Sequence, residues 1–323
     1  MAPFLKRKLT RLALFLGLVL LFINGIAWFH VHSMTSWRES PSRTEKPEEL
    51  GSLDKLGVLL RGVAIPRPTN RSTPETIGRS FETLYFASES GAELEAWYVP
   101  KEGADVTALL FHGYASSKSS MLSVASGLLE LGCSVLLVDF YGSGGSSGTG
   151  TTIGIQEAHD VRAAVQLCRR RWPQQRCLLY GQSMGGAAIL RAIARLEVSP
   201  DAIVVESTFD RLSSTVTSRF QRMNLPATPF SQLLVLWGSV RIGVNAFQHN
   251  PVEDAASVSC PSLVLQGSND PNISIQQARS LATALAGWSR FAPIEKVGHE
   301  DIRRSDLKRW QAEVSALLAR LRR

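Results

Sequence analysis

Signatures of metal and nucleotide binding are missing from this sequence. Its 323 residues hold only four cysteines, none of them in a Cys-x-x-Cys pair, so no zinc site is predicted. There is no Gly-Lys-Ser/Thr triplet, and the glycines of "DFYGSGGSSGTG" are spaced one residue too widely for a dinucleotide fingerprint. We therefore expect no metal and no other cofactor.

The few cysteines do not fix the redox compartment. Cys133, Cys177 and Cys260 each stand at the start of an expected strand, which favours small buried thiols. A disulfide between Cys168 and Cys177 stays open, because pairing cannot be deduced from spacing alone.

Acidic residues are absent before Glu39. In that stretch Lys6, Arg7, Lys8 and Arg11 supply four of the seven net positive charges of the chain. The remainder carries a net charge of only +3, which is too little to indicate a nucleic-acid partner.

An uncharged, mostly apolar run extends from Leu12 to Phe29 directly after these basic residues. Its 18 residues are just long enough for a membrane-spanning helix. The preceding positive charge predicts a cytoplasmic start, with the rest of the chain on the non-cytoplasmic side. Small residues at Gly25 and Ala27 also fit a cleaved signal peptide, which would leave a secreted or periplasmic protein. Residues 1–32 are thus predicted to be an anchor or a signal segment, and the unbroken apolar run favours the anchor.

Residues 33–79 are expected to form a linker and an N-terminal extension. The first part, up to Glu49, is polar and contains two prolines. A helical spacing of apolar residues then begins and ends before Pro66; its members are Leu50, Leu53, Leu56, Leu60 and Val63.

Residues 80–323 are predicted to form one α/β domain. "FETLYFASESGAELEAWYVP" alternates around a polar turn, as a β-hairpin does. Strand-like and helix-like segments alternate after it, which predicts a mostly parallel sheet with helices on both faces. The expected helices are 119–131, 155–171, 184–193 and 306–321, the last with Leu307, Trp310, Val314, Leu317 and Leu321 on one face.

About fifty residues without a strand follow "ESTFDRL", and this length indicates an insertion. We call residues 213–258 the insertion. It follows a strand whose carboxyl end lies where ligands of an open α/β sheet bind, so it is predicted to be a small lid. Phe230, Leu234 and Trp237 are expected to line an apolar pocket under it.

Ser183 lies in Gly181-Gln182-Ser183-Met184-Gly185, between a short apolar strand and an alanine-rich helix. A sharp strand-to-helix turn drives its central residue towards positive φ, and glycines two before and two after remove clashing Cβ atoms. The turn raises the serine hydroxyl above the sheet beside a helix N-terminus. Ser183 is therefore the predicted nucleophile.

The base and the acid should follow later strands, because ligands of an open α/β sheet bind at the carboxyl ends of its strands. Of six histidines, His299 alone comes directly after the last strand, in "KVGHEDI". Asp270 follows the preceding strand, whereas Asp254 precedes it and Asp301 is too close to His299. His299 would accept the serine proton, and Asp270 would orient the imidazole.

The chain resembles the α/β-hydrolase superfamily, nearest to its serine aminopeptidase-like and monoglyceride-lipase-like members. The resemblance rests on "LLFHGYASS", "VDFYGSGGSSG", "GQSMGG", "NPVEDAASVSCPSLVLQGSNDPNI" and "VGHED" and extends over roughly residues 83–321. It implies an oxyanion hole made by the backbone N–H groups of Tyr114 and Met184. Similar sequences often have Asp-x-Arg-Gly where this chain has Tyr141 in place of the arginine, so we expect a retuned loop and an intact triad.

These predictions together describe a serine hydrolase that cleaves acyl or lipid-like carboxylic esters through an acyl-enzyme intermediate. The apolar insertion and the membrane-side location favour such esters over other substrates. The alternatives are a serine peptidase or amidase, a thioesterase, and a membrane-tethered binding domain without catalysis. The expected partners are a small-molecule substrate and a membrane.

Overall fold

The computed structural model describes most of the chain. The described residues are 3–39, 43–44, 51, 54, 57–58, 60 and 62–323. The helix expected between Leu50 and Val63 falls mostly outside these residues.

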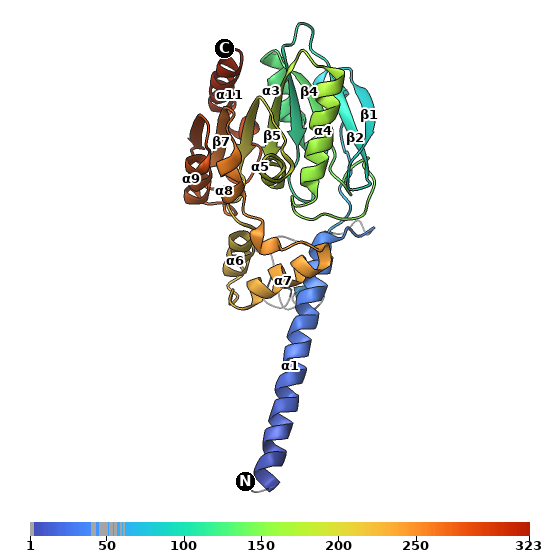
Figure 1. The fold of residues 1–323 in the computed structure, drawn as a ribbon, viewed down its shortest axis with the longest axis vertical. Helices are drawn as coiled ribbons and strands as arrows, with labels where there is room; N and C mark the ends of the chain where they lie inside the picture. The colour runs from blue at the N-terminus through green and yellow to red at the C-terminus, as the bar shows by residue number, and fades with distance from the viewer. Residues whose placement is uncertain are drawn as a thin grey trace.

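A single eight-stranded sheet forms the centre of the domain (Figure 1). Its strands are β1 (Glu82–Ala87), β2 (Glu93–Val99), β3 (Val106–Phe111), β4 (Ser134–Val138), β5 (Arg176–Gln182), β6 (Ala202–Glu206), β7 (Ser262–Gly267) and β8 (Ser289–Ile294). They lie in the order β1-β2-β4-β3-β5-β6-β7-β8. Strand β2 pairs antiparallel with both β1 and β4. The other neighbouring strands are parallel. The predicted hairpin and the mostly parallel sheet are confirmed.

Helices cover both faces of this sheet, as the sequence predicted. One face carries α4 (Glu157–Arg171), α5 (Met184–Leu196) and α9 (Ile275–Ala284). The other carries α3 (Leu122–Glu130) and α11 (Leu307–Leu321), with the short α10 (Ile302–Ser305) between the sheet and α11. The strands β3, β4 and β6 are buried at every residue, which explains why they are apolar runs without alternation.

The ends of some helices differ from those expected. Glu157 rather than Ile155 opens α4, because its carboxylate accepts the N–H groups of Thr152 and Gly154 at 2.8 and 2.9 Å in the turn before the helix. Leu307 was expected on the buried face of α11 but is exposed, since Asp306 caps the helix and Leu307 is its first residue. The other four residues of that face are buried.

A 33-residue helix, α1 (Pro3–Thr35), projects from the domain (Figure 1). The insertion lies between the sheet and the free part of α1. It contains α7 (Phe230–Ile242), α8 (Pro251–Asp254) and nearly all of α6 (Leu212–Arg222), and two 3-10 turns, Ala246–Gln248 and Ala255–Ser257. No strand occurs in these fully described residues, so the predicted absence of strands in the insertion is confirmed.

A buried ion cluster ties the loops at the carboxyl ends of β3 and β4 to the hairpin. Lys118 is fully buried and makes ion pairs with Asp139 and, at 2.5 Å, with Glu95. Asp139 also accepts the backbone N–H of Lys118 at 2.7 Å and that of Gly145 at 2.9 Å. Burial raises the pKa of Asp139, but the charge and hydrogen bonds of Lys118 outweigh it and hold the pKa below its usual value.

We expect Lys118→Met to destabilise the protein by about 3–5 kcal/mol, because it leaves the buried Asp139 carboxylate without its cation. Denaturant unfolding in detergent measures the loss. Lys308→Met removes an exposed lysine from α11 and should change stability by less than about 0.5 kcal/mol. Equal effects of the two substitutions would mean that the cluster does not stabilise the fold.

Candidate active site

Ser183 stands at the junction of β5 and α5 with a strained backbone. Its φ of 51° and ψ of −113° lie outside the regions that L-residues normally adopt. Its N–H donates to the carbonyl of Glu206 at 2.7 Å, so the turn is held to the end of β6. The positive φ predicted from the sequence is confirmed.

The glycines of this turn allow a close approach of backbone segments. A Cβ on Gly185 would lie 2.3 Å from the carbonyl oxygen of Phe111 at the end of β3. A Cβ on Gly181 would lie 2.5 Å from the backbone of Gly185. The start of α5 is thus pressed against β3, and only glycine fits at both positions.

The loop after β3 lies beside Ser183. A Cβ on Gly113 would come within 3.5 Å of the Ser183 Cβ. His112 fixes the loop: its Nδ1 is 2.8 Å from the Gly113 carbonyl oxygen and its Nε2 accepts the N–H of Phe140 at 3.2 Å. Burial is the largest influence on His112 and lowers its pKa, so the ring is neutral and fits this pairing.

Tyr114 and Met184 therefore lie on two loops that meet at Ser183. Met184 is the first residue of α5, where backbone N–H groups have no partner within the helix. Of the two predicted oxyanion donors, Met184 directly follows Ser183 in the chain. Tyr114 directly follows Gly113, which lies against Ser183. Their role as donors stays a prediction.

Asp270 and His299 come from the two strands beyond β6. His299 Nδ1 is 2.7 Å from Asp270 Oδ2. The other carboxylate oxygen accepts the N–H groups of Asn272 and Ile273 at 2.7 and 3.1 Å. Burial raises the pKa of Asp270, but His299 and these N–H groups outweigh it and the pKa lies below its usual value. The carboxylate is therefore ionised near neutral pH and able to stabilise an imidazolium.

Glu206 is a residue that the sequence analysis did not identify. It ends β6, is fully buried, and accepts the Tyr180 hydroxyl and, at 3.0 Å, the side-chain amide of Gln182. Its Oε1 lies 3.3 Å from the N–H of Ile302 in the segment after His299. Burial raises the pKa of Glu206 to about 7. The carboxyl thus links the Ser183 turn to the His299 loop, and a glutamate at the end of the apolar strand β6 gave no signal of that role.

A histidine and an aspartate that were not chosen as base and acid have other partners. The Nε2 atom of His249 lies 3.1 Å from the Ile153 carbonyl oxygen, and burial lowers the pKa of this histidine to about 3. Asp254 pairs at 2.9 Å with Arg195, which lies in the last turn of α5. Tyr141, which replaces an arginine of similar sequences, is held by Asp160 Oδ2 through its N–H at 2.9 Å. All four cysteines are free.

The insertion packs beside the predicted triad. Val235 of α7 is buried in a cluster with Ala187 and Ile273, which follow Ser183 and Asp270 by four and three residues. Trp237 was expected in the same pocket but faces α1: its Nε1 donates to Asn24 Oδ1 at 3.0 Å. The reason is the register of α7, which places Val235 towards the sheet and Trp237 towards the N-terminal helix.

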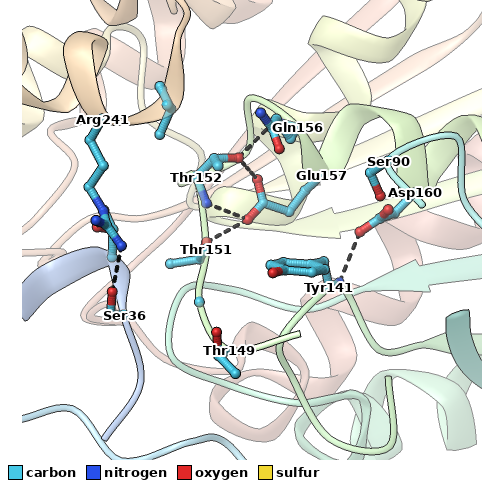
Figure 2. Close-up of a pocket in the computed structure, with 13 residues that line it drawn as sticks. Ser36, Ser90, Tyr141, Thr149, Thr151, Thr152, Gln156, Glu157, Asp160 and Arg241 are labelled. Carbon is cyan, nitrogen blue, oxygen red and sulfur yellow. Dashed lines mark hydrogen bonds between the residues drawn. The ribbon is translucent and has the colours of Figure 1, made fainter. Parts of the chain in front are cut away.

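The end of α1 is part of the wall around this region. The Tyr114 hydroxyl donates to the carbonyl of Met34, and the Thr151 N–H donates to that of Thr35 at 3.0 Å. Arg241 of α7 donates to Thr35 Oγ1 at 2.8 Å. A cavity of about 360 Å³ lies between the end of α1, α7 and the loop 149–157 (Figure 2). Its lining is mainly polar, and the Thr151 hydroxyl on it also contacts the Met184 sulfur at 3.5 Å.

The arrangement has the parts needed for acyl transfer. A strained serine, a carboxylate-bound imidazole and free N–H groups at a helix start are brought to the carboxyl edge of one sheet. Among the described residues, no group of three or more histidine, cysteine, aspartate or glutamate side chains could hold a metal ion.

Comparison with known proteins agrees with this geometry. The family model described as serine aminopeptidase, S33 matches residues 103–253. An uncharacterized protein of Mycobacterium tuberculosis is 30% identical over 220 residues, which are 66% of this chain and 70% of that protein. The Pyrococcus furiosus esterase structure superposes with a TM-score of 0.66 at 22% identity, over 79% of this chain and 96% of that one. The chain belongs to the α/β-hydrolase superfamily.

A more distant relative is a membrane protein by name. A yeast protein called an uncharacterized membrane protein, from Saccharomyces cerevisiae, is 25% identical over 138 residues, 42% of this chain and 49% of that protein. In the hydrolase itself α1 is long and apolar enough to cross a membrane.

For the hydrolase domain we expect Glu206→Gln to change the pH dependence of stability. The folded state holds the Glu206 proton up to about pH 7, whereas the unfolded chain releases it near pH 4.5. Protonation therefore stabilises the fold, and this contribution is lost as pH rises from 4.5 to 7. Relative to the variant, the wild type should lose about 3 kcal/mol over that range.

Denaturant unfolding of both proteins at several pH values measures the difference. Asp160 has a pKa raised to about 7 by burial and titrates in the same range, but it is common to both proteins and cancels. Parallel stability curves for wild type and variant would show that Glu206 does not hold a proton in the fold.

Proposed function

We propose that this hydrolase is a membrane-anchored serine esterase that cleaves acyl esters through an acyl-enzyme intermediate. Ser183 acts as nucleophile, His299 as base and Asp270 as its orienting acid. The observation that carries the proposal is the 2.7 Å pair of His299 and Asp270 at the same sheet edge as the strained Ser183.

In the acylation step, the Ser183 hydroxyl oxygen attacks the ester carbonyl carbon while His299 Nε2 takes the hydroxyl proton. The carbonyl oxygen becomes an oxyanion and accepts the N–H groups of Tyr114 and Met184. Asp270 stabilises the imidazolium and keeps the proton on Nδ1. The carbon–oxygen ester bond then breaks, and His299 gives its proton to the departing alkoxide.

In the deacylation step, a water molecule replaces the alcohol. His299 takes a proton from this water, the hydroxide oxygen bonds to the acyl carbon, and the bond to Ser183 Oγ breaks. The serine oxygen recovers its proton from His299, and a carboxylic acid is released. Losing one backbone donor of such an oxyanion hole typically costs about 10²–10³ in rate.

The N-terminal helix acts in this proposal as a retained anchor with the catalytic domain on the non-cytoplasmic side. Retention is supported by a contact that lies before Trp28, the start of the cleaved form: Asn24 Oδ1 accepts the Nε1–H of Trp237 at 3.0 Å. The yeast relative's name supports a membrane location. The basic residues before Leu12 support the orientation.

Esters are favoured over amides by the apolar cluster of Val235, Ala187 and Ile273 that follows Ser183 and Asp270 and by the esterase neighbour. The runner-up is a serine peptidase, which the description of the matching family model supports. The two differ in substrate, since both use the same serine chemistry.

We expect Ser183→Ala to abolish labelling by a fluorophosphonate probe, because the probe phosphonylates an activated serine. The variant should unfold at the same temperature as the wild type within a few degrees. Gel fluorescence of the purified, detergent-solubilised chain gives the readout. Labelling that persists at another serine would contradict the assignment.

The acid is tested by two asparagine substitutions in the same protein. Asp270→Asn should lower kcat by about 10⁴, as loss of the orienting acid does in serine proteases. Asp254→Asn is the matched control, because Asp254 is buried and paired with Arg195 in the last turn of α5, the end of that helix opposite to Ser183. Reversed effects would show that the acid was assigned wrongly.

We expect the p-nitrophenyl esters that react best to lie between butyrate and octanoate. Each methylene buried in an apolar pocket contributes about 0.8 kcal/mol, so two methylenes should raise kcat/KM about tenfold. Val235→Ala should move the optimum to longer chains, since Val235 packs beside Ala187 and Ile273. Equal rates on acetate and octanoate, or a preference for aminoacyl peptides, would favour the peptidase.

A further inference from the structure

The insertion up to residue 252 is rich in apolar residues and lacks acidic ones. No aspartate or glutamate occurs from residue 211 to residue 252, while Arg211, Arg219, Arg222 and Arg241 fall in that stretch. Large apolar side chains are exposed along it: Phe230, Leu236, Val240 and Phe247. An apolar surface with arginines and without carboxylates is the composition of segments that lie in a membrane interface.

The contacts of α7 with α1 fix its depth relative to a bilayer. A helix needs about 20 residues to cross the hydrocarbon core, so a span that begins after Arg11 ends near Val31. Asn24 and Trp28, which both contact Trp237, precede Val31 by seven and three residues. At about 1.5 Å per residue, Trp237 then lies about 5–10 Å below the boundary of the hydrocarbon.

Arg241 lies one turn further along α7, at the other side of this boundary. Its guanidinium donates to Thr35 Oγ1 and Ser36 Oγ at 2.8 and 2.6 Å, and these residues follow Val31 by four and five positions. No described carboxylate pairs with Arg241. Helix α7 thus places an indole below the boundary and an arginine at the level of the lipid headgroups, where each is favoured.

We infer that α7 lies in the headgroup–acyl boundary of the leaflet that the domain faces, and that the bilayer is the partner of this surface. The inference rests on the proposed anchoring of α1 and goes beyond it, since an anchor alone would hold the domain at any distance. A depth of about 5–10 Å is the depth at which interfacial amphipathic helices lie.

This position gives the predicted site a lipid-side entrance. Val235 faces the cluster that contains Ala187 and Ile273, while the neighbouring Leu236 is 46% exposed. One helix therefore separates the bilayer from the surroundings of Ser183. A single-chain or lipid-like ester in the leaflet can reach the site without crossing water, so the acyl esters favoured above are those that partition into membranes.

The test measures how deep α7 lies in vesicles of phosphatidylcholine and phosphatidylglycerol that contain the full-length chain. Leu236→Cys and, separately, Val240→Cys carry an environment-sensitive fluorophore in a Cys260→Ser background, where the remaining cysteines are buried. Trp288→Cys is the matched control, because Trp288 is also an exposed large apolar residue. It directly precedes β8 and so lies at the amino end of that strand, whereas the predicted site lies at the carboxyl ends of the strands. Quenching by lipid-borne doxyl groups and by aqueous iodide is compared.

The fluorophores at 236 and 240 should be quenched by the doxyl lipids and protected from iodide, and the one at 288 should behave in the opposite way. Equal iodide quenching at 236 and 288 would overturn the inference. Protection from both quenchers that increases with protein concentration would also overturn the inference. Such protection indicates that a protein partner or a second copy of this chain covers the surface.

A second measurement uses activity. Leu236→Asp should lower hydrolysis of a vesicle-borne acyl ester roughly tenfold, while hydrolysis of soluble p-nitrophenyl butyrate stays within about twofold. Equal losses on both substrates would overturn the lipid-side entrance.

Two controls separate failure of this inference from failure of the proposed function. Mass spectrometry of the purified chain shows whether residues before Trp28 are retained, and fluorophosphonate labelling shows whether Ser183 is active. With both intact, an α7 exposed to iodide contradicts only the membrane position of the insertion. A chain that begins at Trp28 contradicts the anchor and the inference together.

Discussion

The strained turn at Ser183 is the constraint around which the rest of the site is arranged. The turn requires the start of α5 to press against the end of β3, which only glycines at 181 and 185 allow. Its backbone is held by the Glu206 carbonyl, and Gly113 lies against its Cβ. A positive φ at a serine costs free energy, so the neighbouring strands and loops must hold it in place. The carboxyl ends of β3, β5 and β6 therefore converge on one residue.

Two buried carboxyl groups support this edge of the sheet in opposite ways. Asp139 is ionised beside Lys118 and collects the backbone N–H groups of two loops. Glu206 is held by the uncharged donors of Tyr180, Gln182 and Ile302, and burial raises its pKa to about 7. The first acts as a charged anchor for the loops after β3 and β4. The second joins the serine turn to the loop of His299 and makes the support sensitive to pH.

The N-terminal helix is continuous with this architecture, although its sequence resembles a simple tether. Its last turn bonds to Tyr114, Thr151 and Arg241, and its apolar middle contacts Trp237 of the insertion. In consequence the C-terminal part of α1, the insertion and the loops beside Ser183 pack against one another. A shift of this part of α1 would move Tyr114, whose N–H is a predicted oxyanion donor.

The sequence by itself determined the sheet, the hairpin, the insertion and the pairing of His299 with Asp270. These features depend on local periodicity and on the rule that ligands gather at the carboxyl ends of parallel strands. It misplaced Leu307 and Trp237 and did not identify Glu206 or Lys118. Whether an apolar residue faces the core, the solvent or a neighbouring helix depends on which segments pack together, and a buried carboxyl has no local pattern. Those features were decided only by the tertiary structure, because contacts between distant segments set the environment of each side chain.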